Sequence, residues 1–260
     1  MSFPVPSSFS PSSLSQFTSC PLAFRFSYVE RRPSQPQPAA TKGTIVHRAL
    51  EHLFHRDPLT RTRDNGHFDL DLAFEEYSQI SDLTDLQLSE SELTIMKSQA
   101  HVLMDKYFEM EDPTHIHPIG LELKLEAKVG DTTIRGIIDR LELDNNGDLV
   151  VTDYKTGSVP RATSEQSRMG GVHIYALLCE KVFGKLPARV QLLYLSQPTT
   201  IISIPTAGTV KGVQVKSSAV HRAVVSACES GDFRPNPSAL CSWCSYQDLC
   251  PAQGGILPHD

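Results

Sequence analysis

The chain has 260 residues, of which 40 % are hydrophobic and 21 % charged, and its formal net charge is −6. These values are ordinary for a globular protein, and the length fits one elaborated domain over residues 1–260. The acidic total argues against indiscriminate nucleic-acid binding but leaves room for a local basic groove. No apolar run reaches the length of a membrane span, and the N-terminal MSFPVPSSFSPSS lacks the features of a signal peptide. We therefore expect a soluble, cytoplasmic protein.

The N-terminal half is predicted to be helical. Ser13-Leu14-Ser15-Gln16 fits a capping box within a first helical segment, and residues 31–41 form a proline-rich loop. Apolar residues then recur at helical spacing in three further stretches. We expect helices from residue 42 or 44 to about 55, from 68 to 80 and from 90 to 110.

The second half alternates between strand and helix patterns. GLELKLEAKV alternates apolar and polar residues, which predicts a half-buried strand. Glu122, Lys124 and Glu126 share its polar face, which we expect to be mostly solvated, with one glutamate able to approach a site on the next strands. The remaining elements are predicted as strands at 132–143, 148–154, 189–195 and 200–204 and helices at 164–183 and 216–230.

One stretch, residues 136–157, carries an unusual polar load. Two apolar runs flank Asn145-Asn146-Gly147, which is strong hairpin-turn chemistry. Asp153 and Lys155 are two apart and therefore project from one sheet face, and the paired strand can bring Asp139 beside them. Two carboxylates and an ammonium suit a divalent metal ion and an activated water. The alternative is a solvated hairpin with a surface ion pair.

His47 is the candidate that extends this set. It shares one face of its predicted helix with Glu51, although a single histidine on a helix is more often structural than a ligand. The carboxylates offer hard oxygen ligands for Mg²⁺ or Mn²⁺, and an imidazole favours Mn²⁺. The backbone carbonyl of Tyr154 could complete the ligand set. Lys155 would then orient the water or stabilise charge on the phosphate.

The six cysteines are unevenly placed. Cys179 and Cys228 lie singly in helical patterns and are expected to be buried. Three others form a C-x2-C-x5-C motif in a cysteine-rich tail, residues 236–251, and Cys20 is the obvious fourth ligand. Four thiolates accept either zinc or a [4Fe–4S] cluster, and spacing does not choose between them. The tail cysteines are Cys241, Cys244 and Cys250.

The motifs GTIVH, GIIDR and DYKTG, followed by the tail cysteines, occur in a recognisable order. In this order they resemble the PD-(D/E)XK nuclease superfamily, especially RecB-type and AddB-type exonuclease domains and the iron–sulfur nucleases of CRISPR adaptation. The resemblance spans residues 12–251. It implies an α/β, restriction-endonuclease-like fold, with a mixed central sheet flanked by helices. It also implies that a four-cysteine cluster joins the N- and C-terminal segments.

The resemblance also implies roles for individual residues. His47, Asp139 and Asp153 would bind the catalytic metal, Mg²⁺ or Mn²⁺, and Lys155 would be catalytic together with the two aspartates. The implied ligands of a [4Fe–4S] cluster are Cys20, Cys241, Cys244 and Cys250.

The sequence departs from the family pattern on the helix after DYKTG. The family carries Q-x3-Y there, and Tyr175 matches the tyrosine, but the glutamine position is Gly171. Gln166 lies nearby but out of register, and His173 is expected to face elsewhere. Turnover or strand preference can therefore differ from the family's.

These features favour a metal-dependent DNA nuclease, an exonuclease on single strands or duplex ends that serves DNA repair or recombination. Tyr175 and Arg140 are the candidate DNA contacts. Four arginines near the motifs either form a local basic path for phosphates or are solvated surface residues: Arg135, Arg140, Arg161 and Arg168. DNA is the expected partner. The sequence has no phosphate loop for ATP, so the nuclease could act alone or alongside a separate helicase. The alternatives are a catalytically weak or inactive iron–sulfur DNA-binding or scaffold module, and a zinc-bound structural protein.

Overall fold

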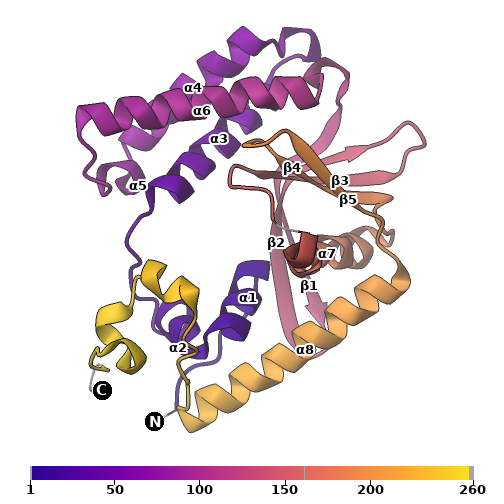
Figure 1. Cartoon of the computed structure of the whole chain (residues 1–260). Coiled ribbons are helices and arrows are strands. Elements are labelled where there is room, and N and C mark those ends of the chain that lie inside the picture. The colour runs from indigo at the N-terminus through magenta and orange to yellow at the C-terminus, as the bar shows by residue number, and fades with distance from the viewer. Residues whose placement is uncertain (1, 161, 258–260) are drawn as a thin grey trace.

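The structure, a computed structural model, describes residues 2–160 and 162–257, apart from the side chains at 81–82 and 162–169. Helices and strands follow one another in the order in which they are labelled in Figure 1. The helices are α1 (Pro11–Ser19), α2 (Pro21–Phe24), α3 (Pro38–His55), α4 (Arg63–Ser78), α5 (Ser81–Thr84), α6 (Glu90–Met110), α7 (Ala162–Phe183) and α8 (Ala207–Ser230). The strands are β1 (Pro118–Val129), β2 (Thr132–Leu143), β3 (Leu149–Lys155), β4 (Arg189–Tyr194) and β5 (Thr199–Ser203).

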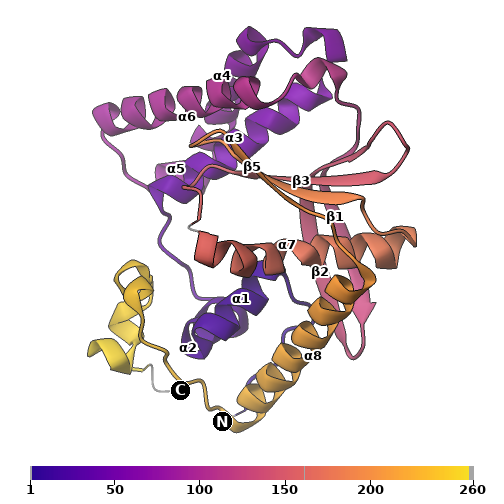
Figure 2. The same ribbon diagram turned by 45° about the vertical axis from the view of Figure 1, so that its right-hand side comes forward.

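The five strands form one mixed sheet in the order β1-β2-β3-β4-β5. All neighbouring pairs are antiparallel except β3 and β4, which are parallel and joined through α7. A parallel pair needs such a crossover, because a tight turn can only reverse the chain. Helices lie on both sides of the sheet (Figures 1 and 2). The predicted α/β fold with a mixed central sheet flanked by helices is confirmed.

The two faces of the sheet bury separate cores. One core contains residues of α1, α2, α7 and α8 packed on Ile134, Ile138 and Val151 of the sheet. The other contains residues of α3, α4 and α6 packed on Tyr154 and Leu193. On β3, Val151 and Tyr154 therefore face opposite layers, so Asp153 and Lys155 share the α7 side while the Tyr154 ring lies under α3. This division places the polar end of β3 between the two helical layers.

Three features near the N-terminus differ from the sequence prediction. The capping box of α1 is formed by Ser10 and Ser13, three residues before the predicted box at Ser13 and Gln16. Part of the proline-rich stretch is helical, since α3 begins at Pro38, whose fixed φ and missing N–H suit a first helical position. Between α2 and the remaining loop, residues Arg25–Val29 form a short π-helix.

Two later helices also start earlier than predicted. Helix α4 begins at Arg63, after an N-cap at Thr62, instead of at residue 68. Helix α8 begins at Ala207, where Thr206 and Thr209 form a capping box. Its first turns contain glycines and β-branched residues of low helix propensity, and for this reason the sequence pattern did not predict a helix there. Among the residues described, no helix combines the length and apolar character that a membrane span requires.

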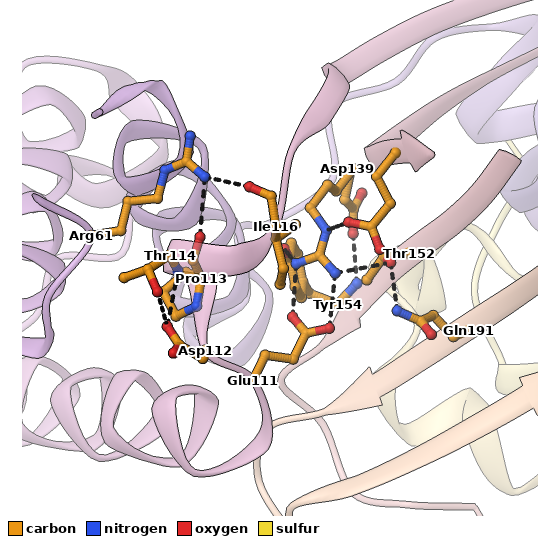
Figure 3. Close-up of polar contacts among 12 residues, drawn as sticks. Arg61, Glu111, Asp112, Pro113, Thr114, Ile116, Asp139, Thr152, Tyr154 and Gln191 are labelled. Atoms are coloured by element: carbon orange, nitrogen blue, oxygen red, sulfur yellow. Dashed lines mark hydrogen bonds and ion pairs between the residues drawn. The ribbon is translucent and has the colours of Figure 1, made fainter. Parts of the chain in front are cut away.

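Arg61, between α3 and α4, forms hydrogen bonds with the segment that precedes β1 (Figure 3). Its side chain is buried and donates to the carbonyl oxygens of Pro113 at 3.1 Å, Ile116 at 2.6 Å and Phe54 at 3.0 Å. A buried guanidinium needs its donors satisfied, and here backbone carbonyls satisfy them. The contact fixes the position of β1 relative to α3, and these two elements both contribute to the site described next.

Candidate active site

The site begins where the pairing of β2 and β3 ends. The last paired residues are Arg140 and Thr152. Just beyond them, the Tyr154 amide donates to Oδ2 of Asp139 at 2.7 Å. The carboxylate of Asp139 thus accepts a hydrogen bond from the backbone of β3, and this bond holds the side chain between the two strands.

Glu122 reaches the same place from β1. It lies between the pairs Leu121–Arg140 and Leu123–Ile138, and therefore opposite Asp139. Its φ is 42°, in the left-handed region that a residue with a side chain rarely adopts. Such strain is commonly found at functional sites, and here it accompanies the only described glutamate of β1 that approaches Asp139 closely enough to share a cation.

His47 enters from α3. Its Nδ1 lies 3.4 Å from Oδ2 of Asp139, and its ring packs edge-on against Tyr154 with centroids 5.9 Å apart. Helix α3 can approach β3 this closely because Gly43 has no side chain: a Cβ there would lie 2.8 Å from Oγ1 of Thr156. Ligand atoms of His47, Glu122 and Asp139 all lie within 4.8 Å of one another. Two carboxylates and an imidazole at this spacing can hold one divalent cation.

Asp153 and Lys155 lie beside these three residues on the α7 side of β3. Asp153 is buried and its Oδ2 forms an ion pair with Nζ of Lys155. Tyr175 of α7 covers the same face, and Gly136 of β2 makes room for it, since a Cβ there would lie 3.0 Å from Cε1 of the tyrosine. Asp153 is not in the three-residue group but is adjacent to it. The four residues predicted to act together, His47, Asp139, Asp153 and Lys155, thus converge.

Burial and crowded carboxylates dominate the electrostatics. Burial, reinforced by the charge of Asp153, raises the pKa of Asp139 to about 8. Burial and the charge of Asp139 raise the pKa of Glu122 to about 7. For Lys155 burial opposes the charged form, but the charges of Asp153 and Asp139 prevail and raise its pKa. Burial lowers the pKa of His47, which leaves its imidazole neutral and able to bind a cation. The site therefore holds protons that a divalent cation would displace.

Two clefts meet at this point. One has a volume of about 910 Å³ and is lined by Asp139, Asp153 and Tyr175, with Gly171 and Arg135 further along. The other, of about 640 Å³, continues on the far side along α3 and Thr156. His47, Glu122 and Lys155 line both. A polymer lying through both clefts would pass directly over the candidate cation site.

The glutamine position of the family pattern opens into the larger cleft. Apart from its chain neighbours and the backbone of its own helix turn, no described atom lies within 4 Å of where a Cβ on Gly171 would stand, so there is space for a side chain. His173 points elsewhere, with Nε2 2.7 Å from Oγ of Ser203. Gln166, Arg161 and Arg168 fall outside the residues or side chains that the structure describes.

Arg140 does not reach the cleft, so its predicted contact with DNA is wrong. Its side chain is 0 % exposed and forms ion pairs with Glu111 at 2.7 Å and Glu142 at 2.8 Å. It also donates to the Tyr154 hydroxyl at 2.8 Å and to Oγ1 of Thr152 at 3.2 Å. The prediction assigned every arginine near the motifs to the surface, whereas this one lies on the sheet face covered by α3. Arg140 holds the Tyr154 ring in place through the hydrogen bond to its hydroxyl. Arg135, by contrast, is exposed and lines the larger cleft.

The four cysteines of the predicted clasp lie along one further cavity. Cys20, Cys241, Cys244 and Cys250 all line it, together with Phe26 and Tyr246. Burial raises the pKa of Cys244, and the charges of the other three thiols add to this shift. All four are described, and no three of their sulfur atoms lie within 4.8 Å of one another. Cys179 and Cys228 are buried elsewhere, as expected.

Comparison with known proteins places this geometry in a family. No curated protein matches the sequence. Among solved structures, a "Putative exonuclease" from Eubacterium rectale superposes with a TM-score of 0.60 at 11% identity, over 98% of this chain and 90% of that chain. The protein SSO0001 has a TM-score of 0.41 at 14% identity, over 82% of this chain and 95% of that one. The model of the PD-(D/E)XK nuclease superfamily matches residues 8–251. The chain therefore belongs to the PD-(D/E)XK nuclease superfamily.

Proposed function

We propose that this chain is a DNA nuclease that depends on Mg²⁺ or Mn²⁺ and acts as an exonuclease on single strands or duplex ends in DNA repair or recombination. The observation that carries the proposal is the group His47, Glu122 and Asp139, within 4.8 Å of one another beside the Asp153–Lys155 pair. This ligand set extends the predicted one by Glu122. The two clefts that meet there suit an extended strand better than a compact small molecule.

The residues would divide the work as follows. His47, Glu122 and Asp139 would hold the cation, with Asp153 and the Tyr154 carbonyl completing its ligands. A bound divalent cation supplies charge stabilisation at a phosphoryl oxygen and lowers the pKa of a coordinated water. Lys155, kept protonated by Asp153 and Asp139, would stabilise negative charge that develops on the phosphate. Tyr175, whose pKa burial and the nearby carboxylates raise, remains a neutral hydroxyl that can donate to the bound strand.

Cleavage of labelled DNA tests the proposal directly. Single-stranded and duplex DNA are incubated with the protein and either Mg²⁺ or Mn²⁺, and both product size and polarity are read on a gel. Asp153→Ala and Lys155→Ala are expected to lose cleavage by at least about 100-fold with the fold intact. The matched controls are Asp131→Asn and Lys128→Ala, because both residues are exposed and line neither cleft. Undiminished metal-dependent cleavage by both site variants would refute the assignment.

A second candidate function is a DNA-binding module without catalysis. Gly171 favours it, because the position that faces the cleft lacks a polar side chain. DNA bound by the unmodified protein but left uncut with either cation would select this alternative. A helicase that supplies single strands is the proposed partner, and cleavage of duplex DNA should then rise when a helicase and ATP are added.

We further propose that Cys20, Cys241, Cys244 and Cys250 hold a [4Fe–4S] cluster. A tetrahedral zinc site with Zn–S bonds of ~2.3 Å needs sulfurs about 3.8 Å apart. All four cysteines line one cavity, and four thiolates are also the ligand set of a [4Fe–4S] cluster. The Ser238 amide lies 3.3 Å from Sγ of Cys241, a donor that would stabilise a thiolate. Anaerobic purification should give a coloured protein with iron and sulfide, and Cys244→Ser should lose both. A colourless protein with one zinc would refute the cluster.

A further inference from the structure

A pair of histidines bridges α4 and α6 and lines neither of the two clefts nor the cysteine cavity. Nδ1 of His67 lies 2.8 Å from Nδ1 of His101. The opposite nitrogen of each ring meets a carboxylate: Nε2 of His67 lies 3.0 Å from Oδ1 of Asp105, and Nε2 of His101 lies 3.1 Å from Oδ1 of Asp71. The four residues form one chain, carboxylate–imidazole–imidazole–carboxylate, across two helices. No motif of the sequence pointed to it.

The hydrogen bonds among these four residues leave the space between the two Nδ1 atoms unexplained. A carboxylate is an acceptor only, so each Nε2 must carry its hydrogen to bond with its aspartate. In neutral rings both Nδ1 atoms then present lone pairs, and these face each other at 2.8 Å. Two lone pairs at that separation repel. A positively charged species between them, either an extra proton or a metal ion, would remove this repulsion.

We propose that His67 and His101 form a binding site for a divalent transition-metal ion of the zinc class. Metal-binding histidines usually donate their second ring nitrogen to a carboxylate, which fixes the ring and strengthens the ligand, and both rings have this partner here. At Zn–N bonds of about 2.0–2.1 Å, tetrahedral ligand atoms stand about 3.4 Å apart, so the rings need to separate by only about 0.6 Å. Imidazole ligands favour Zn²⁺, Ni²⁺ or Cu²⁺ over Mg²⁺.

The site is open to solvent on its remaining side. The side chains of His67 and His101 are 27% and 31% exposed, so water can complete the coordination. Asp105 is also held by Arg63 at 2.7 Å, which orients its carboxylate toward the ring rather than the ion. The ion would therefore have two protein nitrogens and solvent ligands, a site of modest affinity.

Binding there would tie together the two helices that support α3. Arg48 of α3 pairs with Glu76 of α4 at 2.8 Å, and Lys42 of α3 donates to Gln99 of α6 at 2.5 Å. Helix α3 carries His47. A cation between α4 and α6 would therefore stiffen the layer on which His47 stands, without contacting the nuclease site.

Zinc titration of the intact protein tests this site. Calorimetry with ZnCl₂ should show one more zinc equivalent for the unmodified protein than for His67→Gln or His101→Gln. Asp71→Asn should keep the site but weaken it by about 10-fold, because it removes only the partner of His101. At saturating zinc, the melting temperature should rise by ~5 °C more in the unmodified protein than in the histidine variants.

The matched control is His115→Gln, since His115 is exposed and far from the pair in the chain. It should retain the full zinc stoichiometry. Equal melting temperatures in EDTA show that the variants fold, and anomalous scattering at the zinc edge should locate the ion between α4 and α6. Equal stoichiometry and equal zinc-induced shifts in all variants would overturn the proposal and leave a shared proton between the rings.

Discussion

Replacing Asp139 by asparagine is expected to change how the stability of the metal-free protein depends on pH. Burial and the charge of Asp153 raise the pKa of Asp139 to about 8 in the folded state, against a usual value near 3.9 in the unfolded chain. Between these values the folded state binds more protons than the unfolded state. The free energy of unfolding therefore falls as pH rises through this window. Asparagine keeps the acceptor for the Tyr154 amide but cannot ionise.

The magnitude follows from the linkage slope. One group that is protonated only in the folded state contributes a slope of at most about 1.4 kcal/mol per pH unit. From pH 5 to pH 7, the unmodified protein should lose about 2 to 3 kcal/mol of unfolding free energy relative to Asp139→Asn. The separation between the two curves should accumulate across this range and level off above pH about 8, where the carboxylate is ionised in both the folded and the unfolded state.

Urea denaturation in EDTA at pH 5, 6 and 7 measures this difference, with exposed Asp131→Asn as the control that should follow the unmodified protein. Saturating Mn²⁺ should flatten the slope of the unmodified protein, because the cation replaces the protons. Mn²⁺ should have little effect on the pH dependence of stability in Asp139→Asn. Parallel curves for the two proteins in EDTA would show that Asp139 is ionised in the folded state, and the electrostatic argument for a cation site would then fail.

Three further substitutions test the packing around the site. Arg140→Met should destabilise the fold by about 3–5 kcal/mol in urea denaturation, because it leaves Glu111 unpaired against a buried sheet face; a loss below about 1 kcal/mol would contradict the structural role. Gly171→Ala should stabilise the protein by up to about 1 kcal/mol, since the position is helical and open. Gly43→Ala should give no such gain and should slow cleavage, because its Cβ would lie 2.8 Å from Oγ1 of Thr156. Equal stability gains at the two glycines would refute the close packing of α3 on β3.

The elements with one dominant signal were predictable. Helix α6 begins and ends at the residues expected from its apolar spacing, Glu90 and Met110. The hairpin of β2 and β3 follows from Asn145-Asn146-Gly147 between two apolar runs, and Gly147 adopts the positive φ of 76° that such a turn needs. Helix α8 was predicted too short, because low-propensity residues in its first turns are outweighed by a capping box and by packing against α7.

The site was predictable as a set of residue types but not as a geometry. The strand period places Asp153 and Lys155 on one face, and the structure agrees. The same alternation could not say how closely Glu122 approaches, because its side chain depends on a left-handed backbone conformation. Nor could it identify Arg140 as buried, because the sequence does not reveal which sheet face a distant helix covers. The pairing of His67 with His101 joins residues 34 apart on two helices and leaves no local pattern.

The unfavourable features of the candidate site all lie at one point, and a cation would relieve them together. Glu122 has a strained backbone, the surroundings of the half-buried Asp139 disfavour its charged form, and Asp153 adds a second carboxylate beside it. Lys155 offsets part of this repulsion but is a single positive charge on the α7 side. Carboxylates crowded beside a neutral imidazole at the junction of two clefts are what a divalent cation site requires, and stabilisation by Mn²⁺ is the expected and measurable consequence.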